Sequence, residues 1–549
     1  MKTLRALFHL VRADFLERIR RYSFLIVLAL TIWAGYLFVP PVGANYLVLF
    51  VGLKRGIYNS NWIGLMFGFI AASHLALLGF YLVKNAVERD RQTGVGQIIA
   101  TTPIGKLVYV VGKWLSNLAV LALILSVMTM IAVVMQLVRA EDTVVNLWAL
   151  VAPIWLMGLP VLAIAAAMAV LFESISFLRG GLGNVAYTFV WLAAFATVLS
   201  GGIDEATDLA QPYNDLFGFT RQLANIQQQV LAVEPDADIG SGLILSLRGR
   251  ETSTFVWDGV DWTAGILRGR MMWAGLALTI ALASAIPFDR FDPARSRRRL
   301  ERKGLFSYLQ DRIEVIRQGD FLHRKSIETG GIQVATTAHL TPLSNTSKQG
   351  RFFGVLVAEL KLMLRGQNLI WYTGAIGLII ACLASPLDDV RQYLMPAVWL
   401  WPVLIWSQMG IRERRYNTGQ MVFSVPNPVS RQLPSMWLAG VIITVIVGSG
   451  AWMRLALVGE ITSLLSWLVG ALFTPALALA LGVWVGNSRA FETVYPLLWY
   501  IGVINKVPVF DYAGATAEGL AMGMPVVYLA ICAGLIALAV IGRWRQLQI

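Results

Sequence analysis

The sequence predicts an all-α polytopic membrane protein with about twelve transmembrane helices, in two parallel six-span repeats. The first observation is composition: 57% of the 549 residues are hydrophobic and 14% are charged, whereas soluble proteins carry about 25% charged residues. The second is clustering, because the apolar residues form runs of about 20, the length that crosses a hydrocarbon layer of about 30 Å. The third is a motif that occurs once in each half of the chain.

Apolar runs predict six spans in each half of the chain, and residues 1–286 and 351–549 are therefore expected to be the two six-span halves. The first set lies near 23–39, 62–83, 107–135, 148–171, 185–202 and 271–286. The second set lies near 368–384, 393–410, 433–453, 461–485, 491–505 and 524–541. The stretch Gly43–Gly52 is also apolar but is too short to cross.

The basic residues predict the orientation of these spans. Lys and Arg are retained on the cytoplasmic side of membrane proteins, and an even number of spans places both termini on one side. If that side is the cytoplasm, 34 of the 45 Lys and Arg residues are cytoplasmic, 15 of them in 287–367. We therefore expect a multi-pass protein of the cell membrane with both termini cytoplasmic, and we attribute the net charge of +13 to topology, not to a nucleic-acid partner.

Two segments outside the spans are distinctive in composition. Residues 203–268 carry ten acidic residues and four arginines, which indicates an extracellular subdomain with a helix over Asn214–Val233. Residues 287–350 form a basic cytoplasmic linker, whose arginine-rich beginning is expected to contact anionic membrane lipids.

Each half begins with an amphipathic stretch just before its first span. These stretches are Leu4–Arg21 and Phe352–Arg365. Apolar residues at helical spacing, combined with basic residues, are typical of helices that lie along a membrane surface.

The repeated motif lies between the second and third spans of each half. Glu88-Arg89-Asp90-Arg91-Gln92-Thr93-Gly94 is followed nine residues later by Pro103. Glu413-Arg414-Arg415-Tyr416-Asn417-Thr418-Gly419 is followed nine residues later by Pro428. Tyr187 and Trp191 in the fifth span share their spacing with Tyr495 and Trp499. An even number of spans per half gives the halves the same orientation, so a pseudo-two-fold axis along the membrane normal is expected.

The motif, its position and the surface helix before each half together resemble the ABC exporter permeases of the ABC-2 type. The resemblance covers about 1–286 and 351–549. It implies that the loop after each second span is a coupling helix that docks on a separate ATP-binding subunit, so that two ATPase subunits are the expected partners. The implied contact residues in the first half are Glu88, Arg89, Asp90, Arg91, Thr93, Gly94 and Pro103. Those in the second half are Glu413, Arg414, Arg415, Thr418, Gly419 and Pro428. Asp90 corresponds to Arg415 in the motif alignment, so the two contacts are expected to be unequal.

The chain is expected to be a transport subunit and not an enzyme. The phosphate-binding pattern G-x-x-x-x-G-K-[ST] is absent, because Gly105-Lys106 and Gly112-Lys113 are followed by Leu107 and Trp114. ATP and magnesium are thus expected on the partner ATPase, with no cofactor on this chain. No catalytic or metal-binding set is predicted from its two cysteines and four scattered histidines.

The apolar, aromatic spans favour export of a lipid-like, peptide or other amphipathic substrate, whose binding residues the sequence leaves unknown. The alternative is an ion-driven secondary carrier of the major facilitator type, which also has two six-span halves and a long central loop. In that class the loop after the second span often contains Asp-Arg-x-Gly-Arg, which Asp90–Gly94 matches loosely. Against it stand the two surface helices, the long acidic outer segment and the scarcity of charge within the spans.

Overall fold

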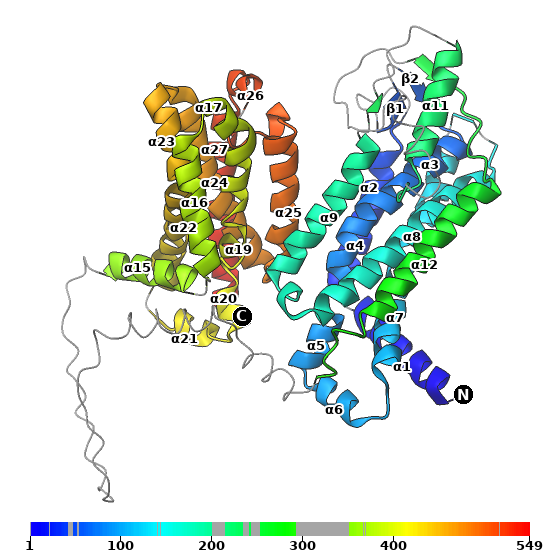
Figure 1. Cartoon of the computed structure of the whole chain (residues 1–549), viewed down its shortest axis with the longest axis horizontal. Helices are drawn as coiled ribbons and strands as arrows, with labels where there is room; N and C mark the ends of the chain where they lie inside the picture. Colours follow the sequence, from blue (N-terminus) through cyan, green and yellow to red (C-terminus); the bar gives the residue numbers. More distant parts are fainter. Residues whose placement is uncertain are drawn as a thin grey trace, which may run out of the picture. The chain divides into compact units, whose positions relative to one another are not determined.

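The computed structural model consists of two compact units, Met1–Arg295 and Ser296–Ile549 (Figure 1). The structure describes residues 2–20, 22–41, 48–51, 54–139, 141–142, 144–199, 215–233, 241–242, 253–291, 351–365, 367, 369–425, 427–514 and 516–548. Residues 292–350 of the predicted linker (287–350) lie outside this set, and so do residues 203–214, 234–240 and 243–252 of the predicted outer segment (203–268). Each unit is described below by itself.

The first unit is built mainly of helices. They are α1 (Lys2–Ile19), α2 (Tyr22–Phe38), α3 (Ser60–Ile70), the π-helical turn η1 (Ala71–Leu75), α4 (Ala76–Val83), α5 (Ala86–Gln92), α6 (Val95–Thr101), α7 (Lys106–Arg139), α8 (Leu147–Ser174), α9 (Gly181–Leu199), α11 (Thr220–Val233) and α12 (Ala264–Ala283). Helix α8 is central, with α3, α4, α7 and α12 packed against it. Gly64 and Gly68 allow α3 to approach closely, because a Cβ at either position would lie under 3 Å from the α8 backbone.

The second unit has a similar order of helices. They are α15 (Arg351–Leu364), α16 (Leu369–Ala384), α17 (Leu387–Asp389), η4 (Val390–Leu394), α18 (Met395–Leu400), α19 (Val403–Trp406), α20 (Arg412–Arg415), α21 (Gly419–Phe423), α22 (Pro428–Val447), α23 (Ser449–Val458), α24 (Ile461–Val485), α25 (Arg489–Trp499), η5 (Tyr500–Ile504), α26 (Ala517–Ala521) and α27 (Met524–Gln548). Helix α24 is central here and packs against α27, α22, α23 and α25.

Seven helical stretches of the described chain are long and apolar enough to cross a membrane. They are Ser60–Gln92, Lys106–Arg139, Leu147–Ser174, Ala264–Ala283, Pro428–Val447, Ile461–Val485 and Met524–Gln548. Three shorter apolar helices are Val27–Phe38, Gly181–Ala196 and Ile370–Ala384. These ten helices coincide with ten of the predicted spans, which agrees with the prediction of a helical membrane protein.

The two remaining predicted spans, 393–410 and 491–505, consist of helical pieces. The first covers part of η4, then α18 and α19, and the second covers α25 and η5. Pro396, Pro402 and Pro496 lie in or beside these pieces. Proline lacks the backbone N–H that continues a helix, and Pro402 lies at the break between α18 and α19, whereas Pro496 lies inside α25, which η5 continues without a break.

A small sheet in the first unit joins two segments that are far apart in the sequence. Strands β1 (Phe50–Val51) and β2 (Lys54–Gly56) are antiparallel, and they pair with β3 (Ser241–Gly242) and β4 (Ser253–Phe255) in the order β3-β1-β2-β4. Helix α11 begins at Thr220 and confirms the helix predicted within 214–233, of which Asn214 lies outside the described residues. The sheet therefore ties the connection after α2 to the segment that precedes α12.

The aromatic pair predicted to match between the halves makes the same contacts in each unit. The Tyr187 hydroxyl donates to the Ala76 carbonyl at 3.0 Å, and Trp191 Nε1 donates to the Ser73 carbonyl at 2.9 Å. In the second unit the Tyr495 hydroxyl donates to the Trp399 carbonyl at 2.7 Å, and Trp499 Nε1 donates to the Pro396 carbonyl at 2.8 Å. In both units the two acceptors are three residues apart.

Candidate functional site

The first candidate surface is loop segment 1, residues 85–105, which contains the short helices α5 and α6 (Figure 1). Asn85 and Gly94 precede these helices with φ of 81° and 76°, a left-handed conformation that turns the chain sharply. The Thr93 hydroxyl donates to the Arg89 carbonyl at 2.9 Å and closes α5. Pro103 lies in the exposed turn before α7, which begins at Lys106.

Glu173 at the end of α8 holds the start of α5. Its buried carboxylate accepts hydrogen bonds from the backbone N–H groups of Asn85, Ala86 (3.1 Å), Val87 (2.6 Å) and Glu88 (3.0 Å). These N–H groups belong to the first turn of a helix and have no acceptor within it, and a negative charge there also interacts favourably with the helix dipole. Helix α8 and loop segment 1 are therefore directly connected.

A buried ionic cluster holds the other side of α5. Lys113 of α7 has no exposed surface, and its Nζ lies 2.6 Å from Asp90 Oδ2 and 2.7 Å from Asp14 Oδ2 of α1. The Tyr109 hydroxyl of α7 donates to Asp90 Oδ2 at 2.7 Å. Two carboxylates thus share one buried ammonium group, and α1, α5 and α7 are joined at one point.

The arginines of the motif are also paired with acids of the same unit. Arg89 lies 2.5 Å from Glu17 of α1, and Arg91 lies 3.0 Å from Asp289, which follows α12. Burial by itself would raise the pKa of Asp289, but the hydrogen bond and charge of Arg91, aided by Arg179, outweigh burial and lower this pKa. Both arginines therefore serve to hold the segment against its own unit.

The exposed part of loop segment 1 is uncharged and partly apolar. Ile98 exposes 66% of its surface and Val95 exposes 42%. The other exposed residues of this part are Gln92, Thr93, Gln97, Thr101, Pro103 and Gly105. The surface that a partner could contact is therefore α6 and its flanks.

Loop segment 2, residues 411–425, contains α20 and α21 and is held in a comparable way. Arg412 lies 2.9 Å from Glu359 of α15. The buried Glu413 carboxylate lies 2.9 Å from the Arg543 guanidinium of α27 and accepts a hydrogen bond from the Gln432 amide of α22. Burial raises the pKa of Glu359, and the nearby Arg412 charge opposes this effect.

The contacts align the two segments in a register that differs from the motif alignment by two residues. An arginine bound to the preceding surface helix is followed by a buried carboxylate in each unit, Arg89-Asp90 and Arg412-Glu413, which are 323 positions apart (412 − 89). Three further pairs have the same spacing. Gly94 and Asn417 both have a positive φ. Tyr109 and Gln432 each donate a hydrogen bond to the buried carboxylate, and Trp114 and Trp437 donate to backbone carbonyls of α8 and α24. In this register Glu413 corresponds to Asp90, whereas the motif aligns it with Glu88.

The same register aligns the two most exposed apolar side chains of the segments. Met421 of α21 exposes 76% of its surface and corresponds to Ile98. Tyr416 exposes 67% and Val425 exposes 48%. Arg414 and Arg415 are exposed, and Arg415 donates to the neutral Gln408 side chain at 2.6 Å.

The predicted contact residues therefore fall into three groups. Buried acids that anchor the segment are Asp90 and Glu413. Partly buried residues at the base of the segments are Glu88, Arg89, Arg91, Gly94, Thr418, Gly419 and Pro428. Exposed residues are Thr93, Pro103, Arg414 and Arg415. Pro428 is the first residue of α22, the position that proline favours.

Several residues that matter to this geometry were missed as site residues. Lys113, Glu173 and Arg543 anchor the segments, and Ile98 and Met421 project from them. A lysine and an acid within or at the end of apolar runs are a usable signal, because isolated charges are rare there unless paired. Arg543 carried no such signal, since basic residues are common at the ends of spans.

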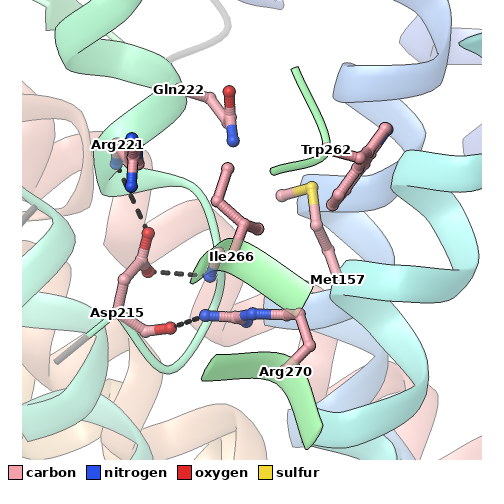
Figure 2. Close-up of a pocket in the computed structure, with 8 residues that line it drawn as sticks. Met157, Asp215, Arg221, Gln222, Trp262, Ile266 and Arg270 are labelled. Atoms are coloured by element: carbon pink, nitrogen blue, oxygen red, sulfur yellow. Dashed lines mark hydrogen bonds between the residues drawn. The ribbon is translucent and has the colours of Figure 1, made fainter. Parts of the chain in front are cut away.

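A pocket in the first unit lies between α8, α12 and the start of α11, and Figure 2 shows the residues that line it. The Arg270 guanidinium donates to the carbonyls of Asp215 and Leu216, the second at 2.8 Å. The Asp215 carboxylate accepts from the Gly218 N–H at 2.7 Å and the Arg221 N–H at 3.4 Å. Burial raises the pKa of Asp215, although the Arg270 charge and these N–H groups oppose it. These contacts close the start of α11 onto α12.

No group of three or more potential metal ligands occurs among the described residues. Comparisons with protein-family models, curated proteins and solved structures found no match to the chain.

Proposed function

We propose that the chain is the transmembrane permease subunit of an ATP-driven ABC exporter, with two parallel six-span halves in the cell membrane and both termini cytoplasmic. Loop segments 1 and 2 would couple these halves to two separate ATPase subunits, which would carry the ATP and magnesium. The proposed cargo is lipid-like, peptide or otherwise amphipathic, because the spans are apolar and aromatic.

One observation carries the proposal: each loop segment is fixed to its own helices by a buried ion pair and presents an exposed apolar side chain at the same register. The anchors are Asp90–Lys113 and Glu413–Arg543, and the exposed side chains are Ile98 and Met421. An exposed apolar side chain on a firmly held element is what a docking contact requires, since little conformational entropy is lost on binding.

The anchors also supply a route for force. A displacement of α6 would act on α5, which is bound to α8 through Glu173 and to α7 through Lys113. Closure of two ATPase subunits could in this way move the long helices α7 and α8. Comparable displacement of α21 would act on α20, whose Glu413 is bound to Gln432 of α22 and Arg543 of α27.

The test is binding of the ATPase to the detergent-solubilised full-length chain. The ATPase is the subunit that copurifies with the chain and contains the G-x-x-x-x-G-K-[ST] sequence. Ile98→Asp and Met421→Asp should each weaken binding about tenfold or more, as expected for a central interface residue. Val256→Asp is the matched control, because Val256 is 63% exposed and lies outside both loop segments.

The proposal fails if no such ATPase binds, or if binding is unaffected by both substitutions. It also fails if the chain alone in proteoliposomes transports a substrate in response to a proton gradient, which would favour the secondary carrier. Glu413→Lys is unsuitable as a test, since it would place two cations together in the buried contact with Arg543.

A further inference from the structure

The loop segments differ in the charge that remains available to a partner, although both are rich in charged residues. In loop segment 1 the charges are paired within the unit: Asp90 with Lys113, Arg89 with Glu17, and Arg91 with Asp289 and, at 4.0 Å, with Glu88. From Gln92 to Gly105 the sequence contains no acidic or basic residue. The exposed part of this segment is therefore neutral.

Loop segment 2 keeps two uncompensated positive charges. Arg412 and Glu413 are paired with Glu359 and Arg543, but Arg414 and Arg415 are exposed and form no ion pair within the described part of the chain. The next acidic residue along the sequence is Glu460. The exposed surface of this segment is thus cationic.

The residues around these arginines are of the kinds that form protein interfaces. Tyr416, whose ring lies against Arg415, and Met421 are exposed in the same segment, which has no lysine. Arginine, tyrosine and methionine are enriched in protein–protein interfaces, whereas lysine is depleted. This composition favours a protein partner over a lipid surface.

We propose that loop segment 2 docks on an acidic site of its ATPase subunit, where carboxylates face Arg414 and Arg415 around the apolar contact of Met421. Loop segment 1 docks on a neutral, apolar site through Ile98. The inference rests on the proposed function and adds the chemistry of each docking site. The two ATPase contacts are then distinguished by charge and not by shape alone.

The experiment measures the affinity of the purified ATPase for the full-length chain in nanodiscs, at about 50 mM and about 300 mM NaCl, a range over which exposed charges become strongly screened. Arg414→Glu/Arg415→Glu should lower the affinity at least about tenfold at low salt and remove most of its salt dependence. Gln92→Glu/Gln97→Glu adds two negative charges to the neutral docking surface of loop segment 1; it should lower the affinity through desolvation of these charges but leave the salt dependence as in the wild type.

Arg5→Glu/Arg12→Glu, on exposed positions of α1, controls for the overall change in charge. Replacing a carboxylate of the ATPase docking site by lysine should restore binding to the Arg414→Glu/Arg415→Glu chain, which would support the inference directly.

Two results would overturn the inference while leaving the proposed function intact. In one, the ATPase binds the wild type and the Arg414→Glu/Arg415→Glu chain equally at both salt concentrations. In the other, the effect of the substitutions disappears in nanodiscs without anionic lipid, which would identify the surface as a headgroup site. If no ATPase binds the wild-type chain, the proposed function and the inference both fail.

Discussion

Lys113 Nζ lies 2.6 Å from Asp90 Oδ2 in a place where the lysine has no exposed surface. An ion pair so buried is weak evidence of net stability, because desolvation offsets much of the attraction. Loss of one partner is costly, however, since an unpaired charge stays behind. The pair therefore makes the position of α5 depend on α7, and it can be tested by removing either member.

Lys113→Met should destabilise the chain by about 3–5 kcal/mol, because the carboxylates of Asp14 and Asp90 would lose their buried cation and be left with the more distant Arg89 guanidinium, at 3.4 Å and 4.0 Å. The measurement is thermal unfolding of the purified protein in detergent. Lys106→Met, on the same helix, removes a hydrogen bond to the Phe288 carbonyl at 2.6 Å and should cost much less. Adding Asp90→Asn to Lys113→Met should restore part of the loss, and equal melting temperatures for the two lysine variants would contradict this view.

Glu173→Gln should loosen the start of α5, because a neutral amide has one acceptor oxygen for the four N–H groups that the carboxylate now binds. Leaving buried donors unpaired costs about 1–3 kcal/mol. Amide hydrogen exchange over 85–92 should therefore accelerate. Glu88→Gln is the control, since the Glu88 carboxylate binds no backbone N–H of α5 among the described residues; it accepts from the Gln92 side chain at 3.1 Å and lies 4.0 Å from Arg91. Unchanged protection in Glu173→Gln would refute the anchoring role.

Gly94 should tolerate asparagine far better than valine. Its φ is 76°, and an added Cβ would meet no atom within 4 Å, so the backbone alone sets the cost. Left-handed backbone costs an ordinary residue about 1–2 kcal/mol, and asparagine adopts it more readily than β-branched residues do. Asn417, at the matching position of loop segment 2, has φ of 52°. Thermal unfolding and ATPase binding should rank Gly94→Asn near the wild type and Gly94→Val well below it; the reverse order would contradict the left-handed conformation of Gly94.

The stability of the region around the small sheet of the first unit should fall at acidic pH through Glu141, which pairs with Arg55 of β2. The hydrogen bond from Arg55, at 2.6 Å, is the main cause that lowers the pKa of Glu141. A carboxylate whose pKa is lower in the folded state contributes stability above its unfolded value, about 4.3, and this stability is lost as pH falls through the folded value. The measurement is the unfolding temperature, followed by tryptophan fluorescence at a series of pH values from 7 to 3.5. Trp62 and Trp257 report on this region, and their ring centroids are 6.1 Å apart.

Glu141→Gln should be less stable than the wild type at pH 7 and should lose less stability on acidification. Other carboxylates titrate in the same range, so the difference between the two proteins is the relevant quantity. A constant difference from pH 7 to pH 3.5 would exclude this role for the Arg55–Glu141 pair.

The helices could be predicted because apolar composition is a local property that persists over a whole span. The runs near 107–135 and 148–171 correspond to α7 and α8. Strands β2 and β4 could not be predicted, since segments of three residues become strands only through their pairing with each other. The twelve-span repeat itself stays a prediction.

The position of the candidate surface could be predicted, but its register could not. The identical residues of the sequence motif align Glu88 with Glu413, whereas the buried ion pairs of the structure align Asp90 with Glu413. The partner of each carboxylate is chosen by tertiary packing, and it comes from different helices in the two units: Lys113 of α7 and Arg543 of α27. Sequence identity over seven residues contains no information on that choice.

The different origins of these partners have a consequence for biosynthesis. Asp90 and Tyr109 are 19 residues apart, whereas Glu413 and Arg543 are 130 residues apart. As the nascent chain leaves the ribosome, the Asp90 contacts of loop segment 1 can form once α7 is made, and its remaining anchors, Glu173 and Asp289, follow within the first unit. Loop segment 2 must wait, with the Glu413 carboxylate solvated, until α27 has been synthesised and inserted. A polypeptide that ends before Arg543 would thus have loop segment 1 anchored and loop segment 2 without its Glu413–Arg543 contact, a difference that quality-control proteases could detect.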